Sequence, residues 1–470
     1  MMTVDDALLG TLPWFLRNPS ATKNLFKQPS ASYLVLDVEA VGPDKASPVN
    51  NKSDLRLACW TIVLPGFAPV TKYLWGDEFS MGPLLEDIES VEFVVAHHAK
   101  YELQWLKRCG AELRDILVWC TFLGQWVLDG NRMLPRDLGS LCTKYKVSAK
   151  WDLIKLFFEG GLTVDDVPKS WILEYCLQDI KSTHEVFLAQ RELVYERDQQ
   201  HLVFQRCLTV ACLADIEFSG MHLDPERIED EHQRVITALT RCEAELREIT
   251  KGINLNSPKQ LGQFLYEDLG FSVPTDRSGK PVLTSSGARP TDSATLASLH
   301  GGSEQQQNFL VVYGEYNRLS SLYSKSLGFF KGVCDHYGGT FRGVFNQGIA
   351  QNHRLSSSGV PLLFPGDPKP KRAQFQNLPR EYKKLFDSGH PDYLLCEADG
   401  AQLEFRVAAD LGKDRVAYQE IVDGVDIHAI TAEELYNAGE PEMLETDDPK
   451  ERRQRAKSRS FRPLTYSGLE

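Results

Sequence analysis

Two acidic residues stand in an otherwise apolar segment near the N-terminus. Residues 33–39 are rich in β-branched and aromatic types, which predicts a buried strand, and they include Asp37 and Glu39. Because side chains alternate along a strand, both carboxylates point to the same face. Two carboxylates there repel each other and lose hydration, and a divalent cation would remove both costs. Asp37 and Glu39 are therefore candidate metal ligands.

The spacing alone is not specific. The chain contains three other Asp-x-Glu triplets, which are Asp87/Glu89, Asp215/Glu217 and Asp224/Glu226. Only the strand context distinguishes Asp37 and Glu39 from these triplets. A metal site at Asp37 and Glu39 therefore needs further acidic residues from the same region.

Two further acids lie beside apolar helical stripes. Glu102 belongs to a helix expected at residues 99–108, and Asp179 to a long helix expected at residues 168–197. Tyr175 is four residues before Asp179, so the two share a helix face. The alternative for Glu102 is a solvated helix surface. The alternative for Asp179 is a carboxylate that accepts a hydrogen bond from neighbouring backbone.

Together, the four acids could hold two Mg²⁺ ions about 4 Å apart. One ion would generate a nucleophilic hydroxide, and the other would stabilise the leaving oxygen of a phosphodiester. Tyr175 could orient the attacking water. The predicted catalytic and metal-binding set of this region is therefore Asp37, Glu39, Glu102, Tyr175 and Asp179.

The order of these motifs resembles the DEDD exonuclease superfamily in its tyrosine-bearing branch. That resemblance implies a ribonuclease-H-like α/β fold and removal of nucleotides from the 3′ ends of DNA. The sequence departs from the family pattern at two positions, because the family usually has Asp where Glu102 stands and Asn where His98 stands. His98 is expected to cap or pack rather than to catalyse.

Several segments of the second half resemble family A DNA polymerases, and in detail bacteriophage members. They are residues 220–224 and 254–261, similar to the thumb; 354–357 and 375–380, similar to template-primer contacts; 399–406, similar to palm motif A; 426–432, similar to the segment that follows motif A; and 453–461, similar to the fingers helix. The likeness covers about residues 31–468. It implies a mostly helical thumb and a partial α+β palm and fingers of a right-hand polymerase.

The resemblance assigns roles to individual residues. Asp399, expected at the end of a strand at 392–399, would be catalytic and bind the polymerase Mg²⁺. The nucleotide would be bound by Glu404, His428, Arg453, Lys457 and Phe461, and DNA by Arg354, Gln376, Asn377, Arg380 and Arg406. Arg453 and Lys457 lie one turn apart on a basic helix expected at residues 449–461, which suits a triphosphate. The alternative is a solvated basic helix.

The second palm carboxylate of the family normally follows a histidine in a His-Asp motif. No His-Asp dipeptide occurs in this sequence. We therefore expect polymerisation to need the rest of the fingers and palm, supplied by a second chain or by splicing, because loss of a preorganised charged group costs on the order of 10²–10³ in rate.

Composition sets the frame for these expectations. Apolar content of 42% and charged content of 25% are typical of a soluble globular protein. The sequence has no run of about 18 apolar residues and no signal-peptide pattern, and its ten cysteines form no Cys-x-x-Cys pair, which favours the cytoplasm (a host cytoplasm for a phage protein). The expected domains are an arm (1–30), an exonuclease domain (31–200), a thumb (201–340), a partial palm (341–430) and the start of the fingers (431–470).

Three functions remain open from the sequence. The first is the N-terminal part of a family A DNA polymerase with a proofreading 3′→5′ exonuclease, acting on primer-template, single-stranded 3′ ends and dNTPs. The second is a stand-alone exonuclease whose polymerase remnant grips DNA. The third is a non-catalytic DNA-binding subunit.

Overall fold

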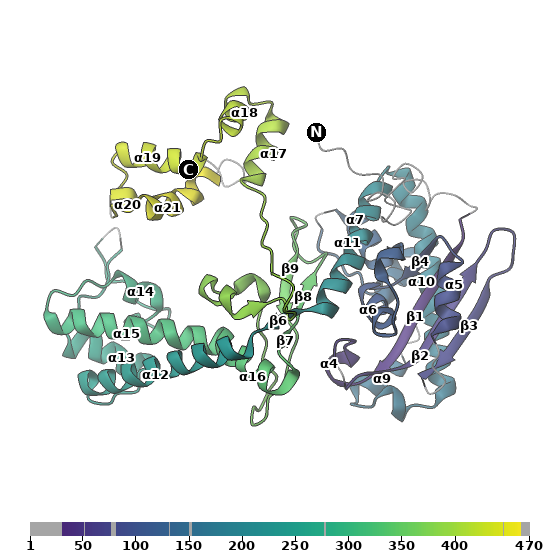
Figure 1. Ribbon diagram of the computed structural model, residues 1–470, viewed down its shortest axis with the longest axis horizontal. Coiled ribbons are helices and arrows are strands. Elements are labelled where there is room, and N and C mark those ends of the chain that lie inside the picture. Colours follow the sequence, from purple (N-terminus) through teal and green to yellow (C-terminus); the bar gives the residue numbers. More distant parts are fainter. Residues whose placement is uncertain are drawn as a thin grey trace. The chain divides into compact units, whose positions relative to one another are not determined.

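The computed structural model describes residues 31–50, 52–76, 81–130, 132–149, 153–276, 279–444 and 446–461. The arm expected at 1–30 lies outside these residues. The chain forms two compact units, Met1–Tyr393 and Leu394–Glu470. Figure 1 shows the elements of each unit.

The first unit begins with a five-stranded sheet in the order β3-β2-β1-β4-β5 (Figure 1). Its strands are β1 (Tyr33–Val41), β2 (Asp54–Val63), β3 (Val70–Trp75), β4 (Phe93–Ala96) and β5 (Val118–Cys120). Strand β2 pairs antiparallel with both β1 and β3, whereas β1, β4 and β5 run parallel to one another. The central strand β1 buries Leu34 and Leu36, since both of its edges are paired.

Helices pack around this sheet, and the long α10 lies along β1. They are α4 (Pro43–Ala46), α5 (Gly82–Glu89), α6 (Lys100–Arg108), α7 (Thr121–Asp129), α8 (Leu138–Tyr145), α9 (Leu153–Glu159), α10 (Lys169–Glu196) and α11 (Gln200–Ser219). One hydrophobic core joins the sheet to α6, α7, α10 and α11.

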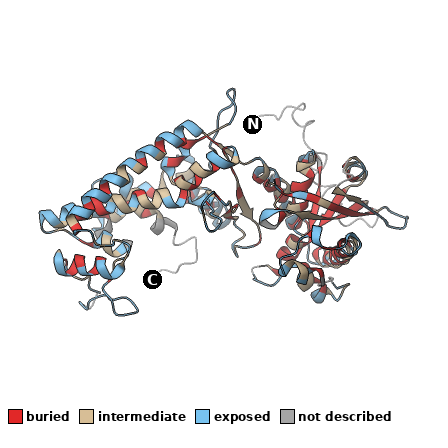
Figure 2. Ribbon diagram, turned by 90° about the horizontal axis from the view of Figure 1, so that it is seen from below, coloured by how far each residue is buried: buried red, intermediate tan, exposed pale blue. Residues whose placement is uncertain are grey.

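The rest of the first unit combines helices with short strands and loops and has its own core. Its helices are α12 (Pro225–Thr250), α13 (Pro258–Gln263), α14 (Ser293–Ser298), α15 (Glu304–Leu322) and α16 (Gly328–Tyr337). Its strands are β6 (Met221–Leu223), β7 (Thr340–Phe341), β8 (Gly343–Asn346), β9 (Ser356–Gly359) and β10 (Phe386–Asp387). Figure 2 shows the long helices with buried residues on one side and exposed residues on the other, as expected for amphipathic helices.

The only regular secondary structure among the described residues of the second unit is helical. It contains α17 (Leu403–Gly412), α18 (Arg415–Val422), α19 (Ile427–Asn437), α20 (Pro441–Leu444) and α21 (Pro449–Phe461). Asp426 caps α19 by accepting hydrogen bonds from the backbone N–H groups of His428 and Ala429.

One predicted strand is wrong. Residues 392–399 form no strand in the structure, so Asp399 does not follow one, and no described strand pairs with this segment. Its apolar residues are exposed, and Leu394 is 95% accessible. An apolar run forms a stable strand only where a neighbour supplies backbone hydrogen bonds and covers its side chains.

Among the described residues, no helix combines the length and the apolar character that crossing a bilayer requires. All ten cysteines lie in described positions, and none of them is in a disulfide.

Candidate functional site

Asp37 and Glu39 lie on the same face of β1 and are half-buried. The thiol of Cys176, on α10, donates a hydrogen bond to Asp37 Oδ2 at 3.2 Å. One ligand atom each from Asp37, Glu39 and Cys176 lies within 4.8 Å of the other two. The strand register shifts between Glu39 and Ala40, and such bulges are common beside active sites because they re-aim side chains.

Glu102 is buried in the first turn of α6. Its Oε2 has no hydrogen-bond partner among the described residues. Burial raises the pKa of the Glu102 carboxyl well above its ordinary value, and the charges of Asp37 and Glu39 raise it further. The surface alternative for Glu102 is therefore wrong, and the structure brings its carboxyl into the electrostatic reach of the β1 acids.

Two contacts fix how α10 lies on β1. Cys176 contacts Asp37, and the Tyr33 hydroxyl lies 2.8 Å from Nε2 of His184. The helix therefore runs antiparallel to the strand over this stretch. Asp179 is three residues after Cys176, or about 4.5 Å along the axis, and thus falls between the two contacts. Asp179 and Tyr175 are both buried, with 3% and 8% exposure.

Cys176 is the site residue that the sequence did not single out. Its position in the apolar stripe of α10 predicted burial only. The sequence did contain a signal for Cys176, because this residue lies between Tyr175 and Asp179. If those two residues are catalytic, their helix face lies against β1, and Cys176 lies on that face.

His98 packs, as predicted. Its ring stacks on Phe122 with centroids 4.2 Å apart, and its backbone has a φ of 58°, which brings the chain from β4 into α6. A non-glycine residue in this conformation is uncommon, and such residues concentrate in tight connections near functional sites.

A buried ion pair and its hydrogen bonds join α6 to α11 and β8. Lys100 Nζ donates to Glu217 Oε1 and to the Phe345 carbonyl, both at 2.7 Å. Gln104 donates to Glu217 Oε2 at 2.8 Å, and the Phe345 N–H donates to Glu217 Oε1. Both carboxylate oxygens are therefore satisfied, and the network holds α6 against α11 and β8.

The structure brings the two predicted DNA-contact segments together. Gln376 donates to the Leu355 carbonyl at 3.0 Å and accepts from the Ser357 N–H at 3.1 Å. A Cβ at Gly359 would collide with the Ala373 backbone, so glycine allows this close approach. The contact places 354–359 beside 373–377.

The remaining predicted DNA contacts of the first unit lie on its surface. Arg354, Asn377 and Arg380 are exposed, and Asn377 donates to Gln374 Oε1 at 2.7 Å. Exposed guanidinium groups beside an ordered hairpin suit contacts to phosphate, which position nucleic acid without reading its sequence.

In the second unit, three predicted nucleotide-binding residues come together where α19 meets α21. Arg453 Nε donates to Asp426 Oδ2 at 2.6 Å. Burial lowers the pKa of His428, and the positive charges of Arg453 and Lys457 contribute to the lowering. The structure describes Phe461 as the last residue of α21, and its side chain lies outside the described part.

Asp399 lies on the segment that leads into α17, Glu404 and Arg406 lie in the first four residues of that helix, and all three are exposed. Arg406 Nε donates to the Ala401 carbonyl at 2.8 Å, which ties this segment to the helix. The described residues of the second unit therefore present Asp399 to solvent.

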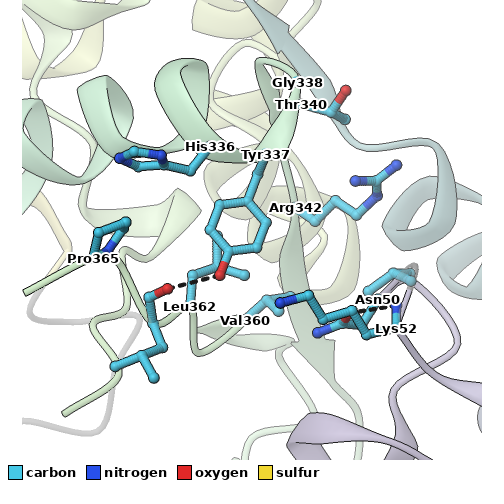
Figure 3. A pocket seen from close by; sticks show the side chains of 12 residues that line it. Asn50, Lys52, His336, Tyr337, Gly338, Thr340, Arg342, Val360, Leu362 and Pro365 are labelled. Carbon is cyan, nitrogen blue, oxygen red and sulfur yellow. Dashed lines mark hydrogen bonds between the residues drawn. The ribbon is translucent and has the colours of Figure 1, made fainter. Parts of the chain in front are cut away.

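A cavity of about 520 Å³ lies apart from the acids, between the loop at 49–52 and α16 with β7. In Figure 3, Tyr337 stands in its centre, with Arg342 and Lys52 on one side and His336 on the other. The Tyr337 hydroxyl donates to the Leu363 carbonyl at 2.8 Å. None of the predicted site residues lines this cavity.

Comparison with known proteins gives consistent results. The chain is 27% identical over 381 residues to DNA polymerase I of Synechocystis sp., which covers 78% of this chain and 36% of that protein. It is 26% identical over 357 residues to DNA polymerase I of Geobacillus stearothermophilus, which covers 72% of this chain and 36% of that protein. The chain thus spans about a third of the length of these relatives.

A solved structure, the POL domain of Pol1 from M. smegmatis in complex with DNA primer-template and dNTP, has a similar fold. The TM-score is 0.62 at 19% identity, over 96% of this chain and 70% of that one. The family model described as DNA polymerase family A matches residues 225–466, which is just over half of the chain. The chain belongs to DNA polymerase family A.

Proposed function

We propose that the chain is a DNA polymerase of family A whose first unit carries a 3′→5′ exonuclease. The observation that carries the exonuclease is the convergence of Asp37, Glu39 and Glu102, with Asp179 on the helix that covers them. The sheet order β3-β2-β1-β4-β5, with its mixed antiparallel and parallel neighbours, supports a ribonuclease-H-like fold.

The donor set fits hard divalent cations. It consists of carboxylates, and the buried Oε2 of Glu102 has no partner among the described residues. Asp37, Glu39, Glu102 and Asp179 would hold two Mg²⁺ ions, which when bound supply a nucleophilic hydroxide and stabilise the leaving oxygen. Tyr175, one turn before Asp179, would orient the attacking water. The low exposure of Tyr175 and Asp179 limits the access of competing water.

The proposed substrates are single-stranded 3′ ends and primer-template DNA. Arg354, Arg380 and Arg406 would contact phosphates, and Gln376 with Asn377 would position the strand. Affinity would then fall as salt rises, since such contacts release counterions. The net charge of −13 keeps this attraction local rather than general.

The polymerase part of the proposal concerns the second unit. Arg453, Lys457 and His428 would bind the dNTP with Phe461, Glu404 would exclude a ribose 2′-hydroxyl, and Asp399 would bind Mg²⁺. Large apolar side chains are exposed on α17 and α18, which supports a cover formed by further polymerase sequence, supplied by a second chain. They are Leu403, Val407, Leu411, Val416, Tyr418 and Val422.

The free cysteines are consistent with the cytoplasm as the setting.

Digestion of a 5′-end-labelled single-stranded oligonucleotide tests the exonuclease. With Mg²⁺, the purified chain is expected to shorten the strand from its 3′ end, and Asp37→Ala is expected to stop this. Glu89→Ala is the matched control, because Glu89 is an exposed member of another Asp-x-Glu triplet and should leave digestion unchanged. Retained digestion by Asp37→Ala would refute the metal assignment.

The two alternatives are separated by adding dNTPs and a primer-template. Extension of the primer after mixing with a chain that carries the His-Asp motif supports a polymerase divided between two chains. Digestion without extension under the same conditions favours the stand-alone exonuclease. DNA binding with neither reaction favours the non-catalytic subunit.

A further inference from the structure

A thiol lies among the acids without a role in the proposed reaction. Cys176 Sγ is 3.2 Å from Asp37 Oδ2 and 3.7 Å from the Asp37 carbonyl oxygen. Cys59 is the direct cross-strand neighbour of Asp37 in the β1–β2 register, and its thiol is within hydrogen-bonding reach of Cys176. Both cysteines are fully buried.

A second observation points to a cation at the same place. The Glu102 side chain is 5% exposed, and its Oε2 has no hydrogen-bond partner in the described part of the chain. The charged groups that act on it most strongly are Asp37 and Glu39. A buried carboxylate within electrostatic reach of two others is costly unless a positive charge is shared among them.

We propose that Cys176 is a sulfur ligand at the Asp37/Glu39 site, which therefore takes a thiophilic divalent cation such as Zn²⁺ or Cd²⁺ in competition with Mg²⁺. Zinc binds thiolate sulfur at about 2.3 Å and carboxylate oxygen at about 2.1 Å in a tetrahedral arrangement, so two ligand atoms of one ion lie about 3.6 Å apart. Cys176 Sγ and Asp37 Oδ2, which are 3.2 Å apart, are already close to that separation.

The chemistry balances without a further reactant. The Cys176 S–H bond breaks, its proton passes to solvent, and the thiolate sulfur bonds to the cation. Sulfur ligands favour zinc and cadmium, whereas Mg²⁺ prefers oxygen. This inference rests on the proposed function for its biological meaning, since the thiophilic ion would displace the Mg²⁺ that digestion needs and so inhibit the exonuclease.

The test is a Cd²⁺ titration of the whole chain without DNA, followed by the ultraviolet thiolate-to-cadmium charge-transfer band. The exposed Cys212 and Cys396 and the partly exposed Cys109 and Cys334 are first replaced by Ser, so that accessible thiols do not contribute. One equivalent of Cd²⁺ is expected to produce the band. Cys176→Ser is expected to abolish it and to weaken Cd²⁺ binding by at least about tenfold, since even outer partners of a metal contribute 10–100-fold.

Cys207→Ser is the matched control, because Cys207 is buried in the same unit and its sulfur accepts from the Cys120 N–H. This variant should keep the band. A band that persists in Cys176→Ser, or that never forms in the parent, would overturn the proposal. If Cys176→Ser does not fold, Cys176→Ala and Asp37→Asn are titrated instead, and unchanged Cd²⁺ affinity in both would also overturn it.

The outcome is separable from that of the digestion assay. A chain that shows the Cys176-dependent band but never digests DNA would refute the exonuclease and leave the sulfur ligand in place. A chain that digests DNA with Mg²⁺ but shows no band would refute the sulfur ligand and leave the exonuclease in place.

Discussion

At the scale of single residues, the candidate exonuclease site depends on charge that the fold alone does not neutralise. Glu102 is the clearest case, because a helix N-terminus favours its negative charge while burial and the β1 acids oppose it. The helix dipole contributes about 0.3–1 kcal/mol, which is less than the cost of a buried unpaired carboxylate. Burial and the charges of the β1 acids therefore outweigh the helix dipole, and the pKa of Glu102 is raised.

This balance predicts that Glu102→Gln stabilises the metal-free protein. Because the pKa of Glu102 is raised in the folded state, its contribution to stability is complete below about pH 4.3, the ordinary pKa of a glutamate. This contribution is lost as pH rises through the folded-state pKa. The variant should gain on the order of 1–3 kcal/mol in free energy of unfolding at the alkaline end. Urea denaturation in EDTA across pH 5 to 9 measures this, and stabilisation by added Mg²⁺ should shrink in the variant. A variant less stable than the parent throughout would contradict the prediction.

At the scale of elements, ion pairs of very different burial join α6 to α11. Lys100 and Glu217 form a buried pair, with Glu217 side-chain exposure of 4%. Lys107 and Asp215 form a pair on the same two helices, with Asp215 52% exposed. Desolvation makes the first pair costly to break, and solvent screening makes the second nearly neutral.

Lys100→Met should therefore destabilise the first unit by about 3–5 kcal/mol, because it leaves Glu217 charged and buried. Lys107→Met is the matched control and should cost less than about 1 kcal/mol. Chemical denaturation of both variants gives the comparison. Equal losses would show that the buried network does not hold the helices together.

A pH-dependent contact holds α12 to the segment before β10. Glu231 accepts hydrogen bonds from Arg234 and Lys384, which lower the pKa of its carboxyl. A lowered pKa contributes stability above the ordinary value, which is lost as pH falls through the folded-state value. Both cations are more than half exposed, so the contribution is about 1 kcal/mol.

Glu231→Gln should accordingly be less stable than the parent at pH 7, with the difference vanishing near pH 3. Thermal denaturation at both pH values measures it. Glu226→Gln, at an exposed position in the first turn of the same helix, should show little difference at either pH.

At the scale of the whole molecule, the boundary between the two units falls in the segment that was expected to be a strand. Residues 391–400 are all exposed and carry no regular secondary structure beyond a turn at the start. Tyr393, Leu394 and Leu395 are 51–95% accessible. Exposed backbone outside helices and strands is a preferred site of proteolysis.

Brief digestion with chymotrypsin should therefore cut first near Tyr393 and release two fragments. The fragment that ends there should keep the cooperative unfolding and, if the proposed function holds, the Mg²⁺-dependent digestion of 3′ ends. Mass spectrometry identifies the cut. First cleavage within the β1–β5 sheet would contradict the two-unit organisation.

The sequence determined the parts of the protein that depend on local periodicity. Alternation placed Asp37 and Glu39 on one face of β1, and helical spacing placed Tyr175 and Asp179 on one face of α10. Residues 99–108 and 449–461 were correctly predicted as helices, with at most one residue of difference in their bounds. The short β5 and the edge strand β3 were not predicted, because three to six residues carry little pattern.

The tertiary structure decided what long-range packing controls. Only the fold brought Cys176 to Asp37, buried Glu102 against the β1 acids, and paired Lys100 with Glu217 across more than a hundred residues. It also left 392–399 without a partner strand. The physical reason is the same in each case: burial and hydrogen-bond partners are properties of neighbours in space, and a local pattern specifies a face but not what covers it.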